Sequence, residues 1–244
     1  MRSYCLTDIG TVRKMNQDFV YASDQPVGIL PNLYIVADGM GGHAAGDYAS
    51  RCAVETMVDY IENASSGGPV TLLGNALAEA NRRVMEKSLS DRSMEGMGTT
   101  LVAAVVQNDC LYVANVGDSR LYLIDDRLEQ VTRDHSLVEE MVRAGELRRE
   151  DARLHPDKNV ITRAVGVKNS VAIDFFDVAL NRGDRFLICS DGLTNMVPED
   201  TIFRIVKEKG SLEAAAKELV DEANRSGGND NISVILAAPD VSGD

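Results

Sequence analysis

The stretch TTLVAAVVQNDCLYVANVGDSRLYLI (99–124) contains three short apolar runs separated by two polar connections. The runs at 99–106, 110–116 and 120–124 are rich in β-branched and aromatic residues, which favour strands. Connections as short as QNDC (107–110) and GDSR leave no room for the crossover that parallel neighbours need. We therefore predict an antiparallel meander through this stretch, in a fold built on antiparallel sheets.

The rest of the chain supplies further strands and two groups of helices. Short runs of similar composition predict strands at 19–23, 33–37, 171–178, 185–189 and 232–237. Amphipathic periodicity and helix-start signals predict helices at 44–61, 71–89, 198–209 and 211–224. Ser211 is the expected N-cap of the last helix. The order of these elements predicts an α+β fold in which helices cover sheet faces, and argues against an alternating βαβ sheet.

Length and charge limit the classes of partner. The chain has 244 residues, 44% of them hydrophobic, which is enough for one sizeable core. We expect a single domain over residues 1–240, because the linker-like stretch NASSGGPV (63–70) is too short to separate two domains. A formal net charge of −13 argues against nucleic acid and anionic membrane surfaces as partners.

The cysteines and the N-terminus favour a cytoplasmic protein. Cys5, Cys52, Cys110 and Cys189 form no CxxC pair, so we expect buried free thiols in a reducing compartment. The first residues, MRSYCLTDIG, lack the apolar stretch of a signal peptide, and no segment approaches the ~20 apolar residues of a membrane span. The sequence leaves open whether a longer parent chain continues beyond Asp244.

Four aspartates lie where an apolar run meets a turn, at Asp38, Asp118, Asp191 and Asp230. Gly39 follows the first and can leave a backbone carbonyl pointing at a ligand. Neighbouring antiparallel strands bring opposite ends together, so we expect Asp38, Asp191 and Asp230 to converge on one sheet edge. Asp118 belongs near a sheet end, at the turn between two strands. Carboxylates with a carbonyl and without cysteine suit Mg²⁺ or Mn²⁺. Turn chemistry explains a single DG or ND sequence, whereas four such aspartates favour a cation site.

Three other side chains complete a candidate phosphate site. Arg13 lies in the loop-like stretch GTVRKMNQD (10–18), and a guanidinium suits a phosphate dianion. Asp18 ends that stretch and is a candidate for holding a metal-bound water. His43 ends DGMGGH and is a candidate proton donor to a leaving alkoxide, or else a solvent-facing residue at a helix start.

The motifs together resemble the metal-dependent Ser/Thr protein phosphatases of the type 2C family, in their short bacterial form. The resemblance spans nearly the whole chain and keeps the order of the family's motifs. It is carried by RKMNQD (13–18), VADGMGGHAAG (36–46), MGTTLVAA (97–104), ANVGDSRLYL (114–123), TRDHS (132–136), ITRAVG (161–166), CSDGL (189–193) and GGNDNISVI (227–235).

The resemblance implies a four-layer αββα sandwich, with two central antiparallel sheets flanked by helix pairs and two metal ions at one end. Asp38 would bridge both ions and the Gly39 carbonyl would bind one of them. Asp191 and Asp230 would hold the other ion. Asp118 would face a third, weaker ion that it shares with Asp191.

The resemblance also implies the reaction, which is hydrolysis of phosphoserine and phosphothreonine monoesters without a phosphoenzyme. A hydroxide bridging the metals would attack phosphorus in line, Arg13 would grip the phosphate, and Asp18 would act through metal-bound water. Animal members have a histidine as proposed general acid where this chain has Met40, and a glutamate where it has Gln17. The acid therefore stays open between His43 and a metal-bound water.

The charged stretch at about 136–168 joins two sheet regions and corresponds to a mobile flap beside the family's site. Long polar connections near a site often control access to it. The alternative is a solvated helical pair without a function. The expected partners are phosphoprotein substrates and a cognate Ser/Thr kinase, and we expect the protein to be a monomer.

Two other functional classes remain to be compared with a metal-dependent phosphatase. An aspartyl-phosphate phosphatase needs a second acid two residues after its nucleophile, and Met40 stands there after Asp38. A non-catalytic domain that binds phosphoproteins would be expected to lose metal carboxylates, and none is missing from the motifs. Trapping of a phosphoenzyme would favour the first alternative, and absence of divalent-ion binding the second.

Overall fold

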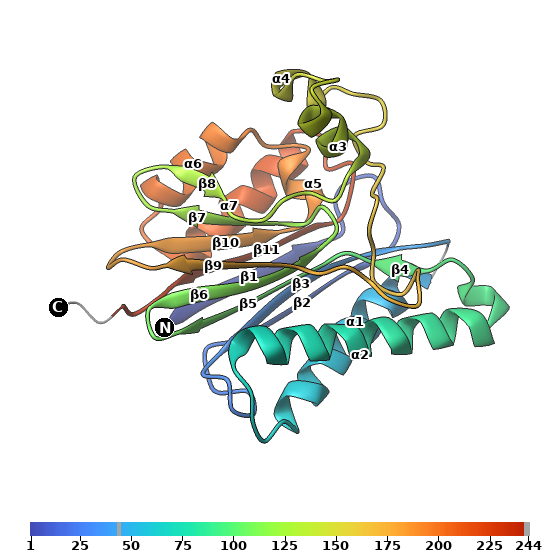
Figure 1. Ribbon diagram of the computed structural model, residues 1–244. Helices are drawn as coiled ribbons and strands as arrows, with labels where there is room; N and C mark the ends of the chain where they lie inside the picture. Colours follow the sequence, from blue (N-terminus) through green and yellow to red (C-terminus); the bar gives the residue numbers. More distant parts are fainter. Residues whose placement is uncertain (43–44, 242–244) are drawn as a thin grey trace.

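Two antiparallel sheets lie face to face in the computed structural model, which describes residues 1–42 and 45–241 (Figure 1). One sheet has the order β2-β3-β5-β6-β9, with β4 paired to β3. Its strands are β2 (Asp18–Ser23), β3 (Leu33–Met40), β4 (Gly98–Thr99), β5 (Leu101–Gln107), β6 (Cys110–Val116) and β9 (Asp174–Ala179). The other sheet has the order β1-β11-β10-β7-β8. Its strands are β1 (Arg2–Asp8), β7 (Arg120–Ile124), β8 (Leu128–Gln130), β10 (Arg185–Cys189) and β11 (Ile232–Ala238).

Helices cover the outer faces of both sheets, which gives the expected four layers. Below the first sheet in Figure 1 lie α1 (Ala45–Glu62) and α2 (Pro69–Ser90). The second sheet is covered by α5 (Asp191–Thr194), α6 (Glu199–Glu208) and α7 (Leu212–Arg225). At one side, α3 (Leu137–Ala144) and α4 (Arg149–Ala152) project away from the layers (Figure 1).

Three apolar layers hold the sandwich together, and strand alternation explains how one strand serves two of them. In β3, Tyr34 and Val36 face the other sheet, whereas Ile35 and Ala37 face the first helix pair. Side chains of a strand point alternately to opposite faces, so a continuous apolar run indicates a strand that is covered on both sides. The same alternation in β10 divides its residues between the middle layer and the second helix pair.

The middle layer offers a test of the packing. Phe186 is fully buried, and its ring meets that of Tyr34 edge to face with 5.4 Å between centroids. We expect Phe186→Ala to lower the free energy of unfolding by about 3–5 kcal/mol, because it leaves a cavity where the two sheets meet. Urea unfolding measures this loss. The matched variant Phe175→Ala, at a side chain 40% exposed on strand β9 of the other sheet, should lose far less, and equal losses would contradict this layer assignment.

The predicted meander over 99–124 is correct in its first half and wrong in its second. Strands β5 and β6 pair antiparallel, and the turn residues Asn108 and Asp109 adopt positive φ angles of 52° and 55°. Strand β7, however, belongs to the other sheet. The chain crosses between the sheets at Gly117, with a φ of 107°, where a Cβ would lie 2.5 Å from the Thr100 Cβ. A short connection requires proximity of the two strands, but not pairing.

Most other predicted elements are confirmed with small shifts of their ends. Strands 110–116, 120–124 and 185–189 have the predicted bounds. Ser211 is the N-cap of α7, and its hydroxyl accepts a hydrogen bond of 3.1 Å from the Ala214 amide. Strands β1 and β8 were not predicted; they are short or partly polar and form the two edges of one sheet.

All four cysteines are free, as predicted, but only Cys189 is buried. Cys5 is exposed, whereas Cys52 and Cys110 are partly buried, so the expectation of four buried thiols was wrong. Alternation on strands of a sandwich turns some side chains of an apolar run outward. In the described ranges, no helix is both long enough and apolar enough to cross a membrane.

Candidate metal centre

The candidate aspartates come together where the ends of both sheets meet. Asp18 and Asp38 are opposite one another in the pairing of β2 with β3. Asp191 begins α5 directly after β10, and Asp230 lies just before β11. The Asp38 carboxyl interacts electrostatically with those of Asp18, Asp118, Asp191 and Asp230. The convergence expected within one sheet is therefore made by two sheets that contribute carboxylates from facing ends.

Burial and mutual repulsion raise the pKa of these carboxyls. Burial, followed by the charges of the neighbouring aspartates, holds the pKa of Asp38 well above its ordinary value. Burial likewise raises the pKa of Asp118 well above the ordinary range. The pKa of Asp18 rises to about 7 and that of Asp191 to about 6, in both cases chiefly because of burial. A cation would balance the charges of the neighbouring carboxylates and so remove the smaller, electrostatic part of these pKa shifts.

Two carboxylate oxygens in this cluster fit a hard cation. Asp18 Oδ1 and Asp191 Oδ1 are buried and have no hydrogen-bond partner in the described part of the chain. The other oxygens are held in place, because Ser190 Oγ donates to Asp18 Oδ2 at 2.8 Å and Asn195 Nδ2 to Asp191 Oδ2 at 2.8 Å. Unpaired anionic oxygens are what Mg²⁺ and Mn²⁺ prefer.

The carboxylates are gathered but do not yet form a closed cage. Among the described residues, no three His, Cys, Asp or Glu side chains are already arranged to hold an ion. Like charges separate when nothing balances them, so small side-chain shifts on binding are expected. The donor set fits a divalent cation in its chemistry, and the ion would complete the geometry.

The backbone at Asp38 is fixed by contacts that only small residues permit. The Asp38 carbonyl accepts hydrogen bonds from Thr99 Oγ1 and the Thr100 amide, both at 2.9 Å. A Cβ on Gly39 would lie 2.0 Å from the Gly46 carbonyl oxygen at the start of α1. Glycine is therefore required here by the close approach of the helix, in addition to the carbonyl role predicted for it.

Arg13 lies beside the cluster, but its guanidinium contacts a candidate ligand. Its Nη2 donates to Asp230 Oδ2 at 2.7 Å, and its Nε contacts the Asn229 carbonyl at 3.4 Å. The Arg13 side chain is 49% exposed, so it borders both the cluster and solvent. The structure thus places Arg13 next to the predicted site without showing it as a phosphate ligand. His43 lies outside the described residues.

Asn231 is a residue of the site that the sequence analysis did not single out. Its Nδ2 donates to the carbonyls of Ile9 at 2.9 Å and Met15 at 3.0 Å, and its Oδ1 accepts from the Gln17 amide at 2.8 Å. These bonds hold the loop of Arg13 against the start of β11. The motif GGNDNISVI contains Asn231, but nothing local in the sequence indicates a partner more than 200 positions away.

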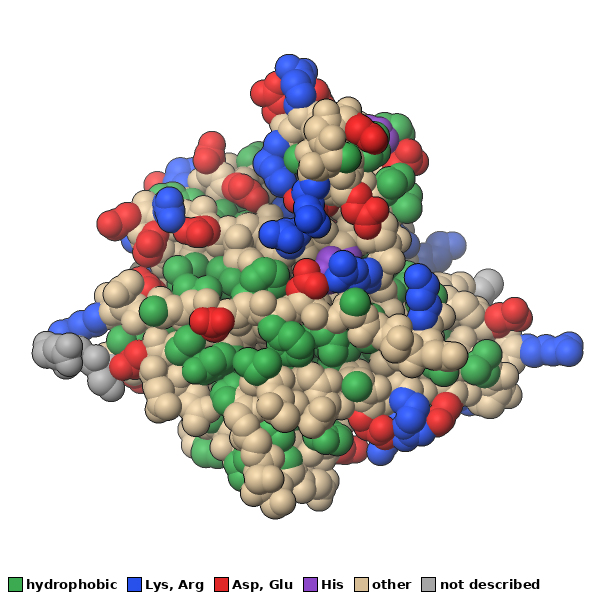
Figure 2. Space-filling view, in the orientation of Figure 1, with side chains coloured by type: hydrophobic (Ala, Val, Ile, Leu, Met, Phe, Trp, Pro, Cys, Tyr) green, Lys and Arg blue, Asp and Glu red, His purple; other side chains and the backbone are tan. Residues whose placement is uncertain are grey.

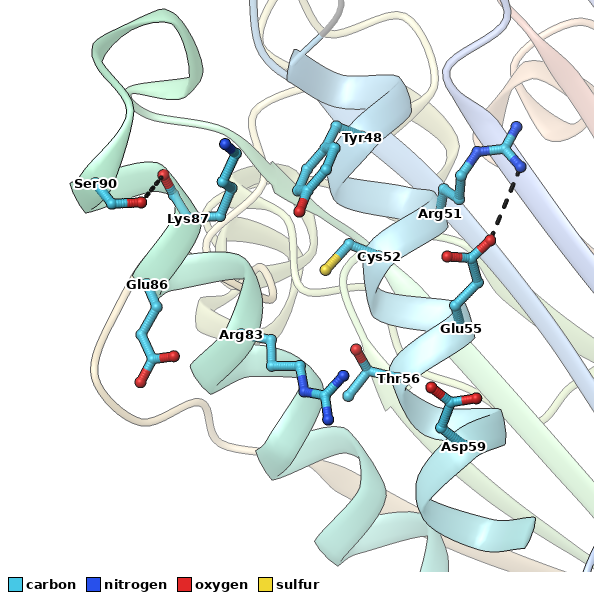
Figure 3. A pocket seen from close by; sticks show the side chains of 10 residues that line it. All are labelled: Tyr48, Arg51, Cys52, Glu55, Thr56, Asp59, Arg83, Glu86, Lys87 and Ser90. Carbon is cyan, nitrogen blue, oxygen red and sulfur yellow. Dashed lines mark hydrogen bonds and ion pairs between the residues drawn. The ribbon is translucent and has the colours of Figure 1, made fainter.

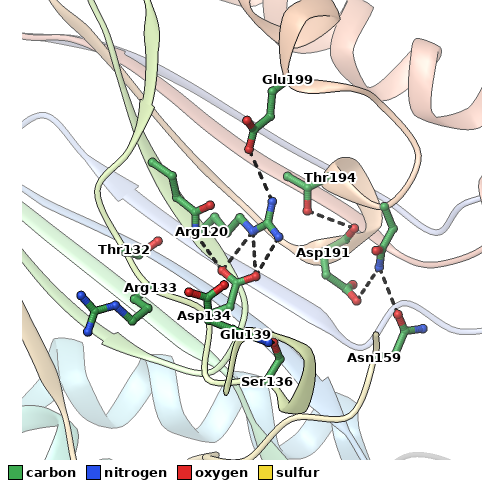
Figure 4. Close-up of polar contacts among 12 residues, drawn as sticks. Arg120, Thr132, Arg133, Asp134, Ser136, Glu139, Asn159, Asp191, Thr194 and Glu199 are labelled. Carbon is green, nitrogen blue, oxygen red and sulfur yellow. Dashed lines mark hydrogen bonds and ion pairs between the residues drawn. The ribbon is translucent and has the colours of Figure 1, made fainter. Parts of the chain in front are cut away.

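A second network supports the connection that carries Asp118. Arg120 donates to both oxygens of Asp134, at 2.7–3.0 Å (Figure 4). The Arg120 charge acts to lower the pKa of Asp118, against the larger effect of burial. His135 accepts a hydrogen bond from the Gly117 amide through Nδ1 at 3.0 Å. The TRDHS motif therefore positions the crossing between the sheets.

A cavity of about 570 Å³ lies beside the cluster, between the 136–168 segment and the region of α5 and α6. Asp118 and Asp191 line it from the body, while Arg149, Arg153 and Lys158 line it from the segment. Figure 2 shows acidic and basic side chains mixed over the projecting part of the molecule. The cavity connects the carboxylate cluster to the segment predicted to control access.

Another cavity, of about 560 Å³, lies between α1 and α2 (Figure 3). Tyr48, Cys52 and Lys87 line it, and none of its lining residues belongs to the carboxylate cluster. Its charged side chains are of both signs and include the pair Arg51–Glu55, 3.9 Å apart. We assign no chemistry to this groove.

Comparison with known proteins supports a phosphatase site. Residues 11–222 match the family model described as Protein phosphatase 2C. The chain is 43% identical over 244 residues to a protein named Serine/threonine phosphatase stp from Listeria monocytogenes serotype 4b, covering 96% of this chain and 94% of that one. It is 40% identical to Protein phosphatase PhpP of Streptococcus pneumoniae serotype 2, covering 96% and 95%.

One solved structure with a similar fold contains metal ions. The catalytic domain of the serine threonine protein phosphatase PstP, in complex with two manganese ions, superimposes with a TM-score of 0.85. It is 33% identical in sequence, and the match covers 96% of each chain. The likeness therefore covers sequence as well as fold, over nearly the whole chain.

Proposed function

The chain belongs to the protein phosphatase 2C family, and we propose that it hydrolyses phosphoserine and phosphothreonine monoesters in proteins with the help of divalent cations. The enzyme class, a phosphoprotein phosphatase, follows from the family and from relatives named for this activity. The observation that carries the chemistry is the buried cluster of aspartates, in which two carboxylate oxygens have no partner among the described residues. Such a cluster is stable in its charged form only when a cation balances it.

The proposed ligands are Asp38, the Gly39 carbonyl, Asp191 and Asp230, with Asp118 directed to a third and weaker ion. Mg²⁺ or Mn²⁺, bound as a pair, would supply charge balance and an activated water for attack on phosphorus. The relative solved with two manganese ions supports this number and this type of ion.

The chain's own groups hold and orient the reactants. Ser190 fixes one oxygen of Asp18, which leaves Oδ1 free to accept a hydrogen bond from bound water. Arg13 would turn from Asp230 to the substrate phosphate once a cation neutralises that aspartate, since both contacts use the same guanidinium. His43 or a water would protonate the leaving alkoxide.

We propose a single domain over residues 1–240, with the 136–168 segment as a flap over the site. The expected substrates are cytoplasmic phosphoproteins made by a cognate Ser/Thr kinase, whose action this enzyme would reverse. The kinase-reversing role is consistent with the named relatives. Gel filtration with light scattering tests the expected monomer, and a dimer would contradict it.

Release of phosphate from phosphoserine and phosphothreonine peptides tests the proposed function. We expect turnover with Mn²⁺ or Mg²⁺, none with excess chelator, and full recovery when the ion is returned. A rapid acid quench during turnover with ³²P-labelled substrate should leave no label on the protein. Metal-independent turnover would contradict the proposal, and a trapped phosphoenzyme would favour attack by an aspartate.

Removal of the proposed phosphate clamp has an effect of predictable size. Arg13→Ala should lower kcat/KM for a phosphopeptide by about 10- to 100-fold, because a hydrogen bond to a charged group contributes about 1.5–3 kcal/mol. Steady-state kinetics at saturating Mn²⁺ measures this. Arg204→Ala, at an exposed side chain on α6, controls for the loss of one positive charge. An Arg13 variant with unchanged kcat/KM would show that the clamp is another group.

A further inference from the structure

One side-chain amide joins the carboxylate cluster to the 136–168 segment. Asn195 is the C-cap of α5, the helix that Asp191 begins, and its Nδ2 donates to Asp191 Oδ2 at 2.8 Å. The same nitrogen lies 3.5 Å from Asn159 Oδ1, in the segment. Figure 4 labels the two acceptors, Asp191 and Asn159. The Asn195 backbone carbonyl also contacts the segment, at 3.4 Å from Arg153 Nη2.

The geometry of the amide makes these contacts interdependent. An asparagine NH₂ group is planar and carries two hydrogens, and here each has one acceptor, Asp191 or Asn159. Rotation of the Asn195 side chain toward one acceptor therefore changes its contact with the other. The contact with Asp191 also determines which carboxylate oxygen remains unpaired, because Oδ2 is engaged and Oδ1 is not.

The position of Asn195 fits this connecting role. It lines the cavity of about 570 Å³ between the segment and the body, together with Asp191, Arg153 and Lys158. A shift of the segment would change two contacts of Asn195, one through its side chain and one through its backbone. Groups that orient metal ligands commonly alter metal affinity when they are changed.

We propose that Asn195 is a positioning residue that couples the placement of the 136–168 segment to the orientation of the Asp191 carboxylate, and thereby to the affinity of the site for a divalent cation. This inference rests on the proposed function, because it takes Asp191 as a metal ligand. It assigns to the segment an effect on ion binding in addition to its proposed effect on access. Linkage requires the coupling to act in both directions.

The test uses three single variants, the double variant Asn195→Ala/Asn159→Ala, and two measurements. Asn195→Ala removes both side-chain contacts, and Asn159→Ala removes only the contact from the segment. Asn63→Ala is a matched control, because Asn63 also directly follows a helix and its Nδ2 donates to the residue four positions earlier, at 2.7 Å from the Asp59 carbonyl oxygen. Calorimetry with Mn²⁺ measures ion affinity. Limited trypsin digestion followed by mass spectrometry measures cleavage at Arg148, Arg149, Arg153 and Lys158, with and without Mn²⁺.

We expect Asn195→Ala to weaken Mn²⁺ binding by about tenfold, the lower end of the range for residues that orient metal ligands. Asn159→Ala should weaken it less, and should have no further effect when Asn195 is already alanine. In metal-free protein, both variants should be cleaved faster within the segment than the unmodified chain. Mn²⁺ should slow that cleavage in the unmodified chain but not in Asn195→Ala, and Asn63→Ala should behave as the unmodified chain throughout.

Two results would overturn the inference. One is an unchanged Mn²⁺ affinity in Asn195→Ala. The other is a protective effect of Mn²⁺ on the segment that is the same with and without the Asn195 side chain. Failure of the proposed function gives a different result, because the unmodified protein would then bind no Mn²⁺ and hydrolyse no phosphopeptide. Circular dichroism identifies a variant that fails to fold, in which case Asn159→Ala, at an exposed side chain, carries both measurements.

Discussion

Replacement of Asp38 by asparagine is expected to reduce kcat by roughly a thousandfold or more, since loss of several kcal/mol of charge stabilisation in the transition state has this effect. Asp38 is the proposed bridge between two ions, and its carboxyl interacts with four other aspartates. The amide has the same shape but no charge, so the fold should be retained. Phosphopeptide turnover at several Mn²⁺ concentrations measures the loss.

The same substitution is expected to stabilise the metal-free protein. Burial among other carboxyls raises the pKa of Asp38 well above its ordinary value, so its charged form opposes folding at neutral pH. Asparagine removes that cost and should raise the free energy of unfolding at pH 7. The control Asp126→Asn, at an exposed position, should change neither kcat nor the free energy of unfolding. An Asp38 variant that is active, or inactive but less stable, would contradict the role assigned to this carboxylate.

Stability of the metal-free protein is expected to fall by several kcal/mol as the pH rises from about 4 to about 7, since each pKa unit corresponds to about 1.4 kcal/mol. Burial raises the pKa of Asp18 from 3.8 to about 7 and that of Asp191 from 3.8 to about 6. A carboxyl whose pKa is raised in the folded state favours folding while it is protonated. Its contribution is complete below the unfolded pKa and is lost as the pH rises through the folded pKa.

Divalent cations should reverse the dependence of stability on pH, because they bind the charged carboxylates. The stabilisation by Mn²⁺ is therefore expected to be small at pH 5 and large at pH 8. Urea unfolding at both pH values, with Mn²⁺ or with chelator, measures the four free energies. In Asp38→Asn the fall with pH should be shallower, because one member of the repelling cluster is gone. A metal-free protein that grows more stable between pH 4 and 7 would contradict the assignment of the cluster as the dominant titrating site.

The sequence predicted where the helices and strands lie better than it predicted which strands pair with one another. Strand composition and helical periodicity depend on neighbouring residues, so 110–116, 120–124 and 185–189 were placed correctly. The connections QNDC and GDSR look alike in length and polarity. One forms a hairpin, and the other crosses between sheets at Gly117, where Thr100 leaves no room for a side chain. That difference depends on tertiary packing.

Some residues of the candidate site were predicted from the sequence and others were not. The aspartates were found because each stands at the end of a predicted strand and lies within one of the family's motifs. The structure brings them together. Asn231, His135 and Asn195 were not found, because each acts through contacts with backbone or side chains remote in sequence. The Arg13–Asp230 pair was not foreseen either, since it joins two proposed roles that had been assigned separately. Long-range hydrogen bonds leave no local pattern that a single sequence reveals.

The proposed activity depends above all on whether the aspartate cluster holds divalent ions. Diffraction from crystals grown with Mn²⁺, measured at the manganese absorption edge, locates such ions directly. We expect two strong anomalous peaks about 3.5–4 Å apart, the usual spacing of two-metal sites. Both should lie among Asp38, Asp191 and Asp230, and Asp38→Asn crystals should lose at least one peak. Absence of anomalous density at these carboxylates, in crystals of active protein, would contradict the account.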